Sequence, residues 1–266
     1  ELFPFSNIIN VNSYGFRGAE FSSNKPIDTY RIFLVGGSTM WGDGNYSDET
    51  TIPGILQKIF DKQKPLAKIE VINAGISGAN TISESKMIEE KIINYEPDMI
   101  IMYDGWNDLR AQYSPEMIYN NWKSVCKLGN DRGFDTFIIV QPLASTGNRV
   151  LTEQEIENVS TVLAYPSNTE QYVMAFDQIK NDCTTTIDFT GIFDYVQEPV
   201  YWDGGHTMNN GNLIIAENIF AVLAPFYFEK QYLSIENQSY EMDSYDTNTT
   251  IYSVGADLSG KDFSGL

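Results

Sequence analysis

Residues 31–42 read RIFLVGGSTMWG, and this stretch decides the fold. The apolar run from Tyr30 to Val35 has the length of a buried β-strand. It leads straight into a turn that carries Ser38, a hydroxyl that a neighbouring base could activate as a nucleophile. A serine directly after an apolar strand predicts an α/β protein whose reactive group lies at the carboxyl end of a parallel sheet.

Strand and helix patterns alternate along the rest of the chain. Further strands are expected at Ile69–Ala74, Asp98–Tyr103, Phe134–Gln141 and Thr185–Asp188, and helices at Thr51–Gln63, Ile82–Tyr95, Pro115–Asn130, Thr169–Asn181 and Asn212–Phe228. This alternation predicts the α/β class, a three-layer α/β/α arrangement with a mainly parallel central sheet. We expect residues 30–232 to form this domain, residues 1–29 an N-terminal arm packed on it, and residues 233–266 a polar tail.

Three more blocks of polar residues follow the serine turn. Residues 73–81 read NAGISGANT after the second strand, and residues 104–109 read DGWNDL after the third. Residues 201–206 read YWDGGH and hold the chain's only histidine, three residues after an aspartate. Asp203 and His206 share one local turn, so the carboxylate can hold one ring nitrogen while the other faces a hydroxyl. A lone histidine is ordinarily structural, but the accompanying blocks favour a catalytic role.

In this order the four blocks resemble those of the SGNH hydrolases, the GDSL-type esterase and lipase superfamily. The family pattern consists of a Gly-Asp-Ser block, an Asn-x-Gly-x-x-Gly block, a Gly-x-Asn-Asp block and an Asp-x-x-His block. The resemblance covers the chain from Arg31 to Phe220. It implies a flavodoxin-like hydrolase fold and a serine esterase that uses no cofactor and no metal.

The resemblance also implies a role for each matching residue. Ser38 would be the nucleophile, His206 the general base and then acid, and Asp203 the group that orients the imidazole. The oxyanion hole would combine the backbone N–H groups of Ser38 and Gly78 with the side-chain amide of Asn107. Such donors stabilise the charge of a tetrahedral intermediate, and losing one costs on the order of 10²–10³ in turnover.

The chain departs from the family pattern at two blocks. Gly37 stands where an aspartate usually precedes the serine, and Thr207 stands where proline or leucine commonly follows the histidine. We expect the departure at Gly37 to change the fine adjustment of the site more than its activity. In the second block Gly78 occupies the position expected for the oxyanion hole, and Gly75 is expected to make the tight turn that leaves the strand.

Three of the four tryptophans lie within three residues of a catalytic candidate. Trp41, Trp106 and Trp202 are candidates for substrate binding, as a platform for a sugar ring or an aromatic group. The alternative is that each packs beneath a loop as a structural wedge. Asp104 and Asp108 could be taken for metal ligands, but no other carboxylates share a recognisable spacing, so capping of their loop is favoured.

The composition is globular and strongly acidic. The 266 residues include 36 Asp and Glu against 17 Lys and Arg, which gives a net charge of −19. Such a surface repels nucleic acid and anionic membranes, so neither is an expected partner. No stretch approaches the ~20 apolar residues of a membrane helix, and no signal peptide is present. Because the chain begins at Glu1, we expect a secreted or cell-surface protein whose leader is missing from it.

The two cysteines, Cys126 and Cys183, lie near the ends of two predicted helices. They lack metal-ligand spacing, and one histidine does not complete a zinc site. A disulfide and two buried free thiols both fit this pattern.

Three segments lie outside the predicted core. In the arm, Arg17 could reach toward the site, or Phe16 and Arg17 could pin the arm onto the sheet. Residues 144–168 form an insertion with a helix expected at Leu151–Val162, begun by a capping box of Thr152 and Glu155. The insertion is either a lid-like substrate wall or a cover for a hydrophobic edge.

The tail from residue 236 has the composition of a linker. Leu258 and Phe263 each follow an aspartate and precede Ser-Gly, five residues apart. This spacing resembles the start of a pentapeptide-repeat solenoid, which would imply that the natural protein continues past Leu266; the alternative is coincidence in a tail rich in small residues.

Together these patterns predict a carboxylic-ester hydrolase that forms an acyl-enzyme on Ser38. Short acyl esters, such as O-acetyl groups of glycans, are the expected substrates. An O-acyltransferase on the same site is one alternative. The other is a catalytically inactive carbohydrate-binding or cell-surface module, against which the intact Ser, Gly, Asn, Asp and His residues argue.

Overall fold

The computed structural model describes residues 9–63, 67–159 and 169–243. The chain divides into two units, Glu1–Ala224 and Pro225–Leu266. The sheet and the candidate site belong to the first unit.

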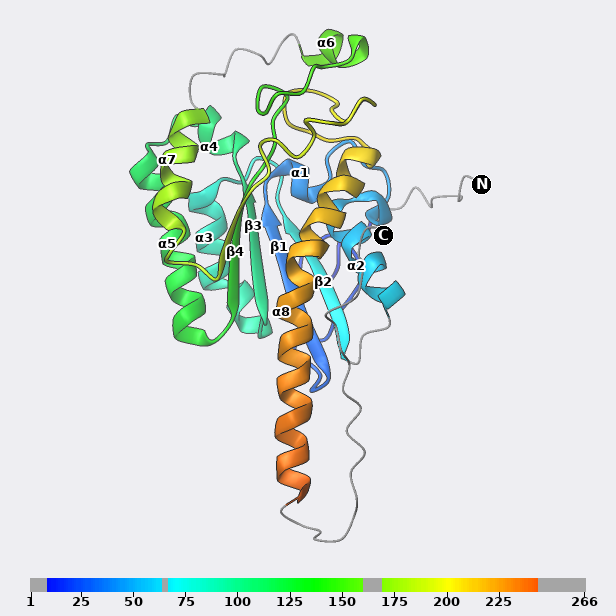
Figure 1. Ribbon diagram of the computed structural model, residues 1–266, viewed down its shortest axis with the longest axis vertical. Helices are drawn as coiled ribbons and strands as arrows, with labels where there is room; N and C mark the ends of the chain where they lie inside the picture. Colours follow the sequence, from blue (N-terminus) through cyan, green and yellow to red (C-terminus); the bar gives the residue numbers. More distant parts are fainter. Residues whose placement is uncertain (1–8, 64–66, 160–168, 244–266) are drawn as a thin grey trace. The chain divides into compact units, whose positions relative to one another are not determined.

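Within the described residues, the sheet has five parallel strands in the order β2-β1-β3-β4-β5 (Figure 1). The strands are β1 (Thr29–Gly36), β2 (Lys68–Gly75), β3 (Met99–Asp104), β4 (Asp135–Val140) and β5 (Thr185–Asp188). The chain passes from β1 to β2 on one side and then returns across β1 to β3, so the strand order reverses beside β1. Ligands bind at such a switch point in open α/β sheets. The predicted α/β class with a parallel central sheet is confirmed.

The register brings three strand ends level with one another. Gly36, the last residue of β1, pairs with Gly75 of β2 and with Tyr103 of β3. The segments that follow these strands therefore start at one edge of the sheet. Two short helices begin there, α1 (Ser38–Trp41) and α4 (Trp106–Arg110).

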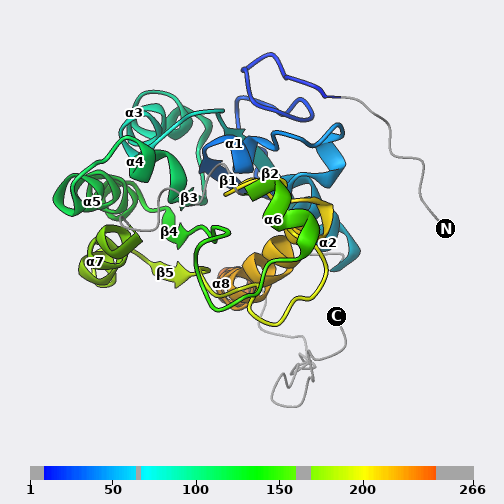
Figure 2. The ribbon, with the colours of Figure 1, turned by 90° about the horizontal axis from the view of Figure 1, so that it is seen from above.

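Helices cover both faces of the sheet, as Figure 2 shows. One face carries α3 (Thr81–Glu90), α5 (Pro115–Arg132) and α7 (Thr169–Ile179), and the other carries α2 (Ile52–Gln63) and the first part of α8 (Asn209–Asp243). Successive side chains of a strand point to opposite faces. Phe33 and Val35 accordingly pack in the cluster under α5, and on the α2 side the rings of Phe60 and Phe220 lie 5.1 Å apart.

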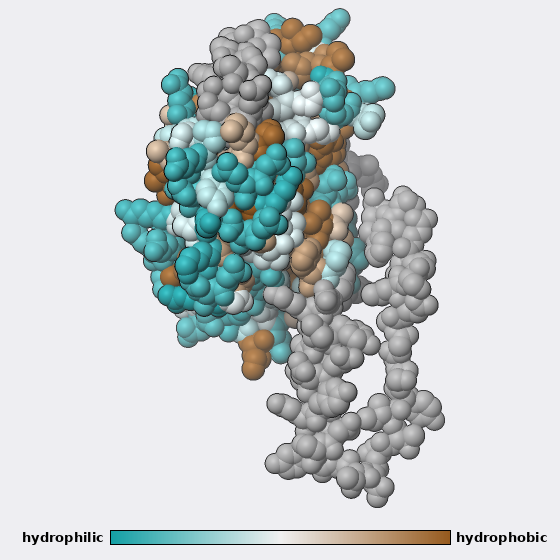
Figure 3. Space-filling model, turned by 60° about the vertical axis from the view of Figure 1, so that its left-hand side comes forward, coloured by the Kyte–Doolittle hydropathy of each residue, from teal (hydrophilic) through white to brown (hydrophobic). Residues whose placement is uncertain are grey.

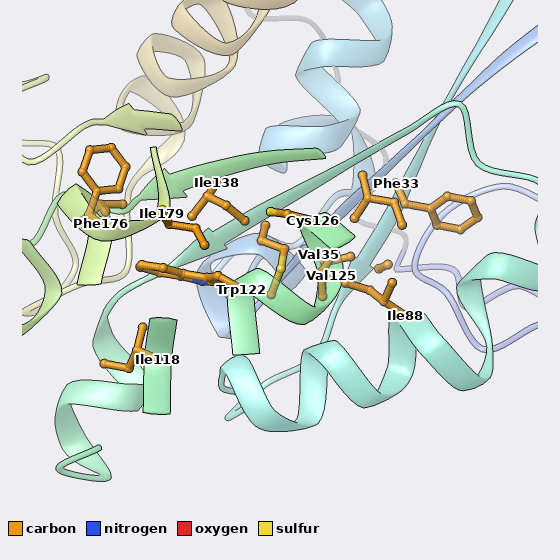
Figure 4. Close-up of a cluster of buried hydrophobic side chains, with 14 of the residues drawn as sticks. Phe33, Val35, Ile88, Ile118, Trp122, Val125, Cys126, Ile138, Phe176 and Ile179 are labelled. Atoms are coloured by element: carbon orange, nitrogen blue, oxygen red, sulfur yellow. The ribbon is translucent and has the colours of Figure 1, made fainter. Parts of the chain in front are cut away.

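The core under α5 contains the largest fully buried side chain, Trp122, together with Cys126 (Figure 4). Cys126 forms a disulfide with Cys183, which lies just before β5. The structure thus decides between the two states that the sequence left open. The bond ties α5 to the segment that leads into the edge strand.

Two predicted helices differ from the structure by more than the few residues that separate the others from it. The helix expected at Ile82–Tyr95 is α3 followed by a separate 3₁₀ turn at Ile92–Tyr95. The last helix was expected to end at Phe228, but α8 continues to Asp243. Residues 229–243 contain no Gly or Pro and several good helix formers, which explains why a segment of polar composition is helical rather than a linker. The proposed pentapeptide units lie outside the described residues.

The face in Figure 3 is mainly hydrophilic, with hydrophobic residues scattered in small groups. In the described part of the chain, no helix combines the length and apolarity that crossing a bilayer requires.

Candidate active site

Ser38 is the first residue of α1, directly after β1 and two glycines. A Cβ atom on Gly36 would lie 2.8 Å from the carbonyl oxygen of Tyr103, and one on Gly37 would lie 2.4 Å from Asn107 Nδ2. Both distances are too short for any side chain to fit without a shift. Gly37 therefore lets the Asn107 amide approach the serine turn.

The only histidine reaches Ser38 from a loop far along the chain. His206 Nε2 lies 2.7 Å from Ser38 Oγ, and His206 Nδ1 lies 2.7 Å from Asp203 Oδ2. The other oxygen, Asp203 Oδ1, accepts hydrogen bonds from the backbone N–H groups of Gly205 and His206. The structure thus brings Ser38, His206 and Asp203 into one chain of hydrogen bonds.

The environment of Asp203 keeps it ionised. Burial alone would raise the pKa of Asp203, but the hydrogen bonds from the His206 ring and from two backbone N–H groups outweigh it and hold the pKa below its usual value. A charged carboxylate on Nδ1 favours a proton on that nitrogen. The lone pair of Nε2 then faces the serine hydroxyl.

Gly78 and Asn107 follow the ends of β2 and β3. Gly78 has a φ of +81° and is exposed, with nothing within 4 Å of the place where a Cβ would be. Asn107 Nδ2 donates to the carbonyl oxygen of Ala79 at 2.6 Å. That bond uses one amide proton and orients the second, since the amide nitrogen carries two.

Gly75 does not make the tight turn that the sequence suggested. It is the last residue of β2, outside the positive-φ region, and a Cβ there would lie 2.2 Å from the backbone nitrogen of Trp41. Its role is to let α1 pack directly on the end of β2. Gly78 supplies the left-handed backbone at this block instead.

The three candidate tryptophans occupy different surroundings. Trp106 is 7% exposed, packs edge-on against His206 with ring centroids 4.9 Å apart, and lies where a Cβ on Gly205 would clash. This packing favours a structural role for Trp106, which holds the imidazole in place, and not the expected role as a platform for substrate. Trp41 is half-buried, with the Arg17 guanidinium 5.6 Å from its ring. Trp202 is 46% exposed.

Arg17 is buried at the carboxyl end of α1. Its Nη1 donates to the carbonyl oxygens of Trp41 and Gly42 at 3.0 and 3.1 Å, and its Nη2 donates to that of Asn45 at 3.0 Å. Nε pairs with Asp48 at 2.8 Å. Arg17 therefore holds the loop behind Ser38 and not the reacting atoms themselves.

The insertion holds the histidine loop through a residue that the sequence marked only as a helix cap. The capping box forms as predicted: the Thr152 backbone N–H and hydroxyl both lie 2.9 Å from Glu155 Oε2, and Glu155 N donates back to Thr152 Oγ1. The Glu155 carboxylate is fully buried, pairs bidentately with Arg149, and accepts the N–H groups of Val200 and Tyr201.

These contacts explain the acidity of Glu155. Burial would raise its pKa, but the Arg149 guanidinium and the backbone N–H donors lower the pKa to about 2. No sequence pattern links residues 149–155 with the loop some 45 residues later, so sequence reasoning could not assign this role.

Three buried carboxyl groups lie beneath Asn107. Asp108 accepts hydrogen bonds from the backbone N–H and hydroxyl of Thr81, and Asp104 accepts one from Trp122 Nε1 at 2.7 Å. Glu84 of α3 is 1% exposed and lies beside both. Asp108 thus accepts from Thr81, the first residue of α3, rather than capping its own loop. Within the described residues, no group of three or more His, Cys, Asp or Glu is arranged to hold a metal ion.

Burial raises the pKa of all three carboxyls. The pKa of Glu84 is raised well above its usual value by burial and then by the neighbouring Asp104. That of Asp104 is raised by burial, although its hydrogen bonds oppose the shift. Burial and the charge of Asp104 raise the pKa of Asp108 to about 6. The cluster therefore retains protons at a pH where exposed carboxyls have lost them.

Comparison with solved structures finds proteins of similar fold at low sequence identity. No protein-family profile matches the sequence, and no curated protein matches it. The acetyl xylan esterase AlAXEase superposes with a TM-score of 0.57 at 13% identity, covering 73% of this chain and 99% of that one. Axe2, an acetylxylan esterase from Geobacillus stearothermophilus, gives 0.58 at 17% identity, with 72% and 93% covered.

A G-D-S-L family protein from Desulfitobacterium hafniense gives a TM-score of 0.56 at 11% identity, with 73% of this chain and 99% of that one covered. These likenesses show that the chain has the α/β fold of GDSL-type esterases.

Proposed function

We propose that this protein is a serine esterase that hydrolyses carboxylic esters through an acyl-enzyme on Ser38. The observation that carries the proposal is the hydrogen-bonded chain from Ser38 Oγ through His206 to Asp203, with 2.7 Å at each of its two links. A serine, an imidazole and an orienting carboxylate in this geometry are the parts that acyl transfer requires.

The reaction follows from the positions of the atoms. Ser38 Oγ attacks the ester carbonyl while His206 Nε2 takes its proton, and Asp203 stabilises the imidazolium that forms. His206 then returns the proton to the departing alcohol. A water molecule, deprotonated by the same nitrogen, attacks the acyl-enzyme, releases the acid and restores the Ser38 hydroxyl.

The negative charge of the tetrahedral intermediate needs donors already in place. We assign them to the backbone N–H groups of Ser38 and Gly78 and to the second amide proton of Asn107. The space beside Gly78 is open to a substrate, and Asn107 is fixed by its bond to Ala79, so its amide does not have to reorganise when charge develops.

Short acyl esters carried by a sugar are the proposed substrates. Trp202 precedes the triad aspartate and is 46% exposed, and its ring lies 3.4 Å from the position of a Cβ on Gly44, in the loop after α1. An exposed indole next to the triad aspartate in the chain suits the face of a sugar ring. Two of the structurally similar proteins are acetyl xylan esterases, which agrees with this substrate class.

The test is turnover and active-site labelling of the intact protein beside two serine variants. Ser38→Ala should lose fluorophosphonate labelling and at least about 10⁴-fold in acetyl-ester turnover. Ser124→Ala, at an exposed serine of α5, is the matched control and should keep both. Absence of labelling in correctly folded intact protein would overturn the proposal and favour an inactive binding module.

Substrate and acceptor need separate measurements. We expect acetate release from acetylated xylo-oligosaccharides to exceed hydrolysis of butyryl esters, and Trp202→Ala to weaken the former more than the latter. Acetyl groups recovered on an added sugar, in preference to acetate, would instead identify an acyltransferase.

We also propose a secreted or cell-surface location. The Cys126–Cys183 disulfide supports it, because such bonds persist in oxidising compartments. Fractionation of the source cells tests this location. Recovery of the protein in the medium or on the cell surface would support it, and recovery in the cytosol would contradict it.

A further inference from the structure

Two segments from distant parts of the chain meet at the Ser38–His206 hydrogen bond. One is α1 with the loop that follows it, and the other is residues 200–208, which include His206. They touch directly where Thr39 Oγ1 donates to the carbonyl oxygen of Gly205 at 3.2 Å. A second connection lies behind the reacting atoms and passes through a single buried side chain.

That side chain is Asn212, in the first turn of α8 and 1% exposed. Its Nδ2 donates to Asn45 Oδ1 at 3.1 Å and to the carbonyl oxygen of Thr50 at 2.9 Å. Its Oδ1 accepts from Thr207 Oγ1 at 2.5 Å. Both amide protons face loops on the nucleophile side, and the oxygen faces the residue directly after His206.

Arg17 extends this network to α1. It donates to the carbonyl oxygens of Asn45 and Gly42. The N–H of Gly42 in turn donates to the carbonyl oxygen of Ser38 at 2.8 Å. A continuous path of buried hydrogen bonds therefore runs from the serine, through Arg17, Asn45 and Asn212, to the neighbour of the histidine.

We propose that Asn212 is a positioning residue for the esterase site, which keeps Ser38 Oγ and His206 Nε2 within hydrogen-bonding distance. The proposal rests on the function proposed above. Asn212 touches neither substrate nor reacting atom, so it acts by holding Thr207 at a fixed distance from Asn45 and Thr50. Displacements of about 1 Å at a reacting pair can cost on the order of 10² in rate.

Only an amide in this orientation serves all three contacts. The two acceptors on the nucleophile side require two donors, and the hydroxyl of Thr207 requires an acceptor. In Asn212→Asp the shape is kept, but a carboxylate oxygen faces two other oxygens. We expect the loops to separate at this point while the core under α8 stays packed.

The experiment compares Asn212→Asp with Asn218→Asp, the same substitution six residues later at an exposed position of α8. We expect Asn212→Asp to lower kcat on an acetyl ester by about 10- to 100-fold, with KM changed less than about twofold. The rate of fluorophosphonate labelling should fall in parallel, and Asn218→Asp should match the parent in both.

Thr207→Val provides a second variant for the case in which Asn212→Asp does not fold. It removes the hydroxyl and keeps the branched shape, so it breaks the link on the histidine side alone. We expect it to lower kcat in the same direction by a smaller factor. In the double variant Thr207→Val with Asn212→Ala, the loss of kcat should be smaller than the product of the two single losses, because both substitutions break the same path of hydrogen bonds.

The sole histidine gives a readout that does not depend on turnover, since all imidazole NMR signals belong to His206. In the parent, Ser38→Ala should shift these signals. In the Asn212→Asp background, the same substitution should shift them much less, because the contact is already loosened. That result supports the positioning role even if the parent proves inactive on every ester.

Equal kcat, equal labelling and equal imidazole shifts in Asn212→Asp and Asn218→Asp would overturn the inference. A lower melting temperature in Asn212→Asp with none of these changes would assign Asn212 to stability alone, and would also overturn it. If the parent protein is not labelled by the fluorophosphonate, that result counts against the esterase proposal and not against the positioning role of Asn212.

Discussion

The two halves of the candidate site are held in different ways. Ser38, Gly78 and Asn107 follow the ends of adjacent parallel strands, and the register of β1, β2 and β3 brings them together. Asp203 and His206 lie on a loop after the edge strand β5, which a backbone bridge between Tyr201 and Thr207 closes but which is not part of the sheet in the described residues. Buried side chains hold that loop instead, Glu155 from the insertion and Asn212 from α8. Pairing within the sheet thus positions one half, and a few buried polar side chains hold the loop that carries the other.

The largest expected effect is on the loop half. Glu155→Gln removes the charge that pairs with buried Arg149 and weakens two backbone contacts of the histidine loop. Breaking a buried pair on one side costs about 3–5 kcal/mol of unfolding free energy. Urea unfolding measures it, and Glu153→Gln, exposed in the same helix turn, is the control. If the two variants unfold alike, the insertion does not brace the loop.

The disulfide tests the sheet half without touching the loop. Cys126→Ser with Cys183→Ser opens a link that spans 57 residues, which corresponds to about 4 kcal/mol in the chain-entropy account. We expect a lower melting temperature and, at temperatures where the variant is folded, unchanged kcat. A parallel loss of kcat in folded protein would contradict the independence of the two halves.

Gly37→Ala attacks the strand-end half at the site itself. The new Cβ would meet Asn107 Nδ2 at 2.4 Å, so the amide must leave its place beside Ser38. We expect kcat to fall by on the order of 10²–10³, the loss typical for one oxyanion donor. Asn107→Ala should cost as much alone and add little to Gly37→Ala. Full additivity in steady-state kinetics would show that Gly37 and Asn107 act separately.

The pH dependence of stability tests the carboxyl cluster below Asn107. The pKa of Asp108 is raised to about 6 in the folded chain, so the Asp108 carboxyl loses its proton at a lower pH in the unfolded chain than in the folded one. Stability therefore falls between about pH 4 and pH 6, by on the order of 3 kcal/mol for this group. The raised pKa values of Glu84 and Asp104 act in the same direction.

Groups with lowered pKa values set the opposite limit. Glu155, with a pKa of about 2, and Asp203 contribute stability that is lost as the pH falls below their unfolded values. We therefore expect maximum stability near pH 4–5 in urea titrations. Glu84→Gln should flatten the decline toward pH 8, whereas Glu89→Gln, exposed on the same helix, should not. A stability that rises from pH 5 to pH 8 would contradict this account.

This comparison also explains what the sequence could predict. The strands predicted before Ser38, Gly78 and Asn107 were enough to expect these residues at one edge of the sheet, because the carboxyl ends of parallel strands lie at the same edge. The Asp-x-x-His spacing predicted the contact between Asp203 and His206. The resemblance of the four blocks to those of a known family predicted that Ser38 is their partner. The strand at Thr185–Asp188 and the capping box of Thr152 and Glu155 were also confirmed by the structure.

What the sequence could not predict depends on contacts between distant segments. Glu155 and Asn212 carry no pattern that links them to the histidine loop, since each acts through side chains that meet only in the folded chain. The close approach of α1 to Gly75 likewise depends on packing, and was mistaken for a turn requirement. Trp106 lies in a candidate block, but its burial against His206 follows from the position of Gly205, nearly a hundred residues later.

The site of covalent labelling in the intact protein shows whether Ser38 is the nucleophile. After reaction with a fluorophosphonate, mass spectrometry of the digested protein should find one adduct per chain, on the peptide that contains Ser38. Labelling should be lost in His206→Ala and reduced in Asp203→Ala. An adduct on another serine, or equal labelling without His206, would contradict the account of Ser38, His206 and Asp203 as one catalytic unit.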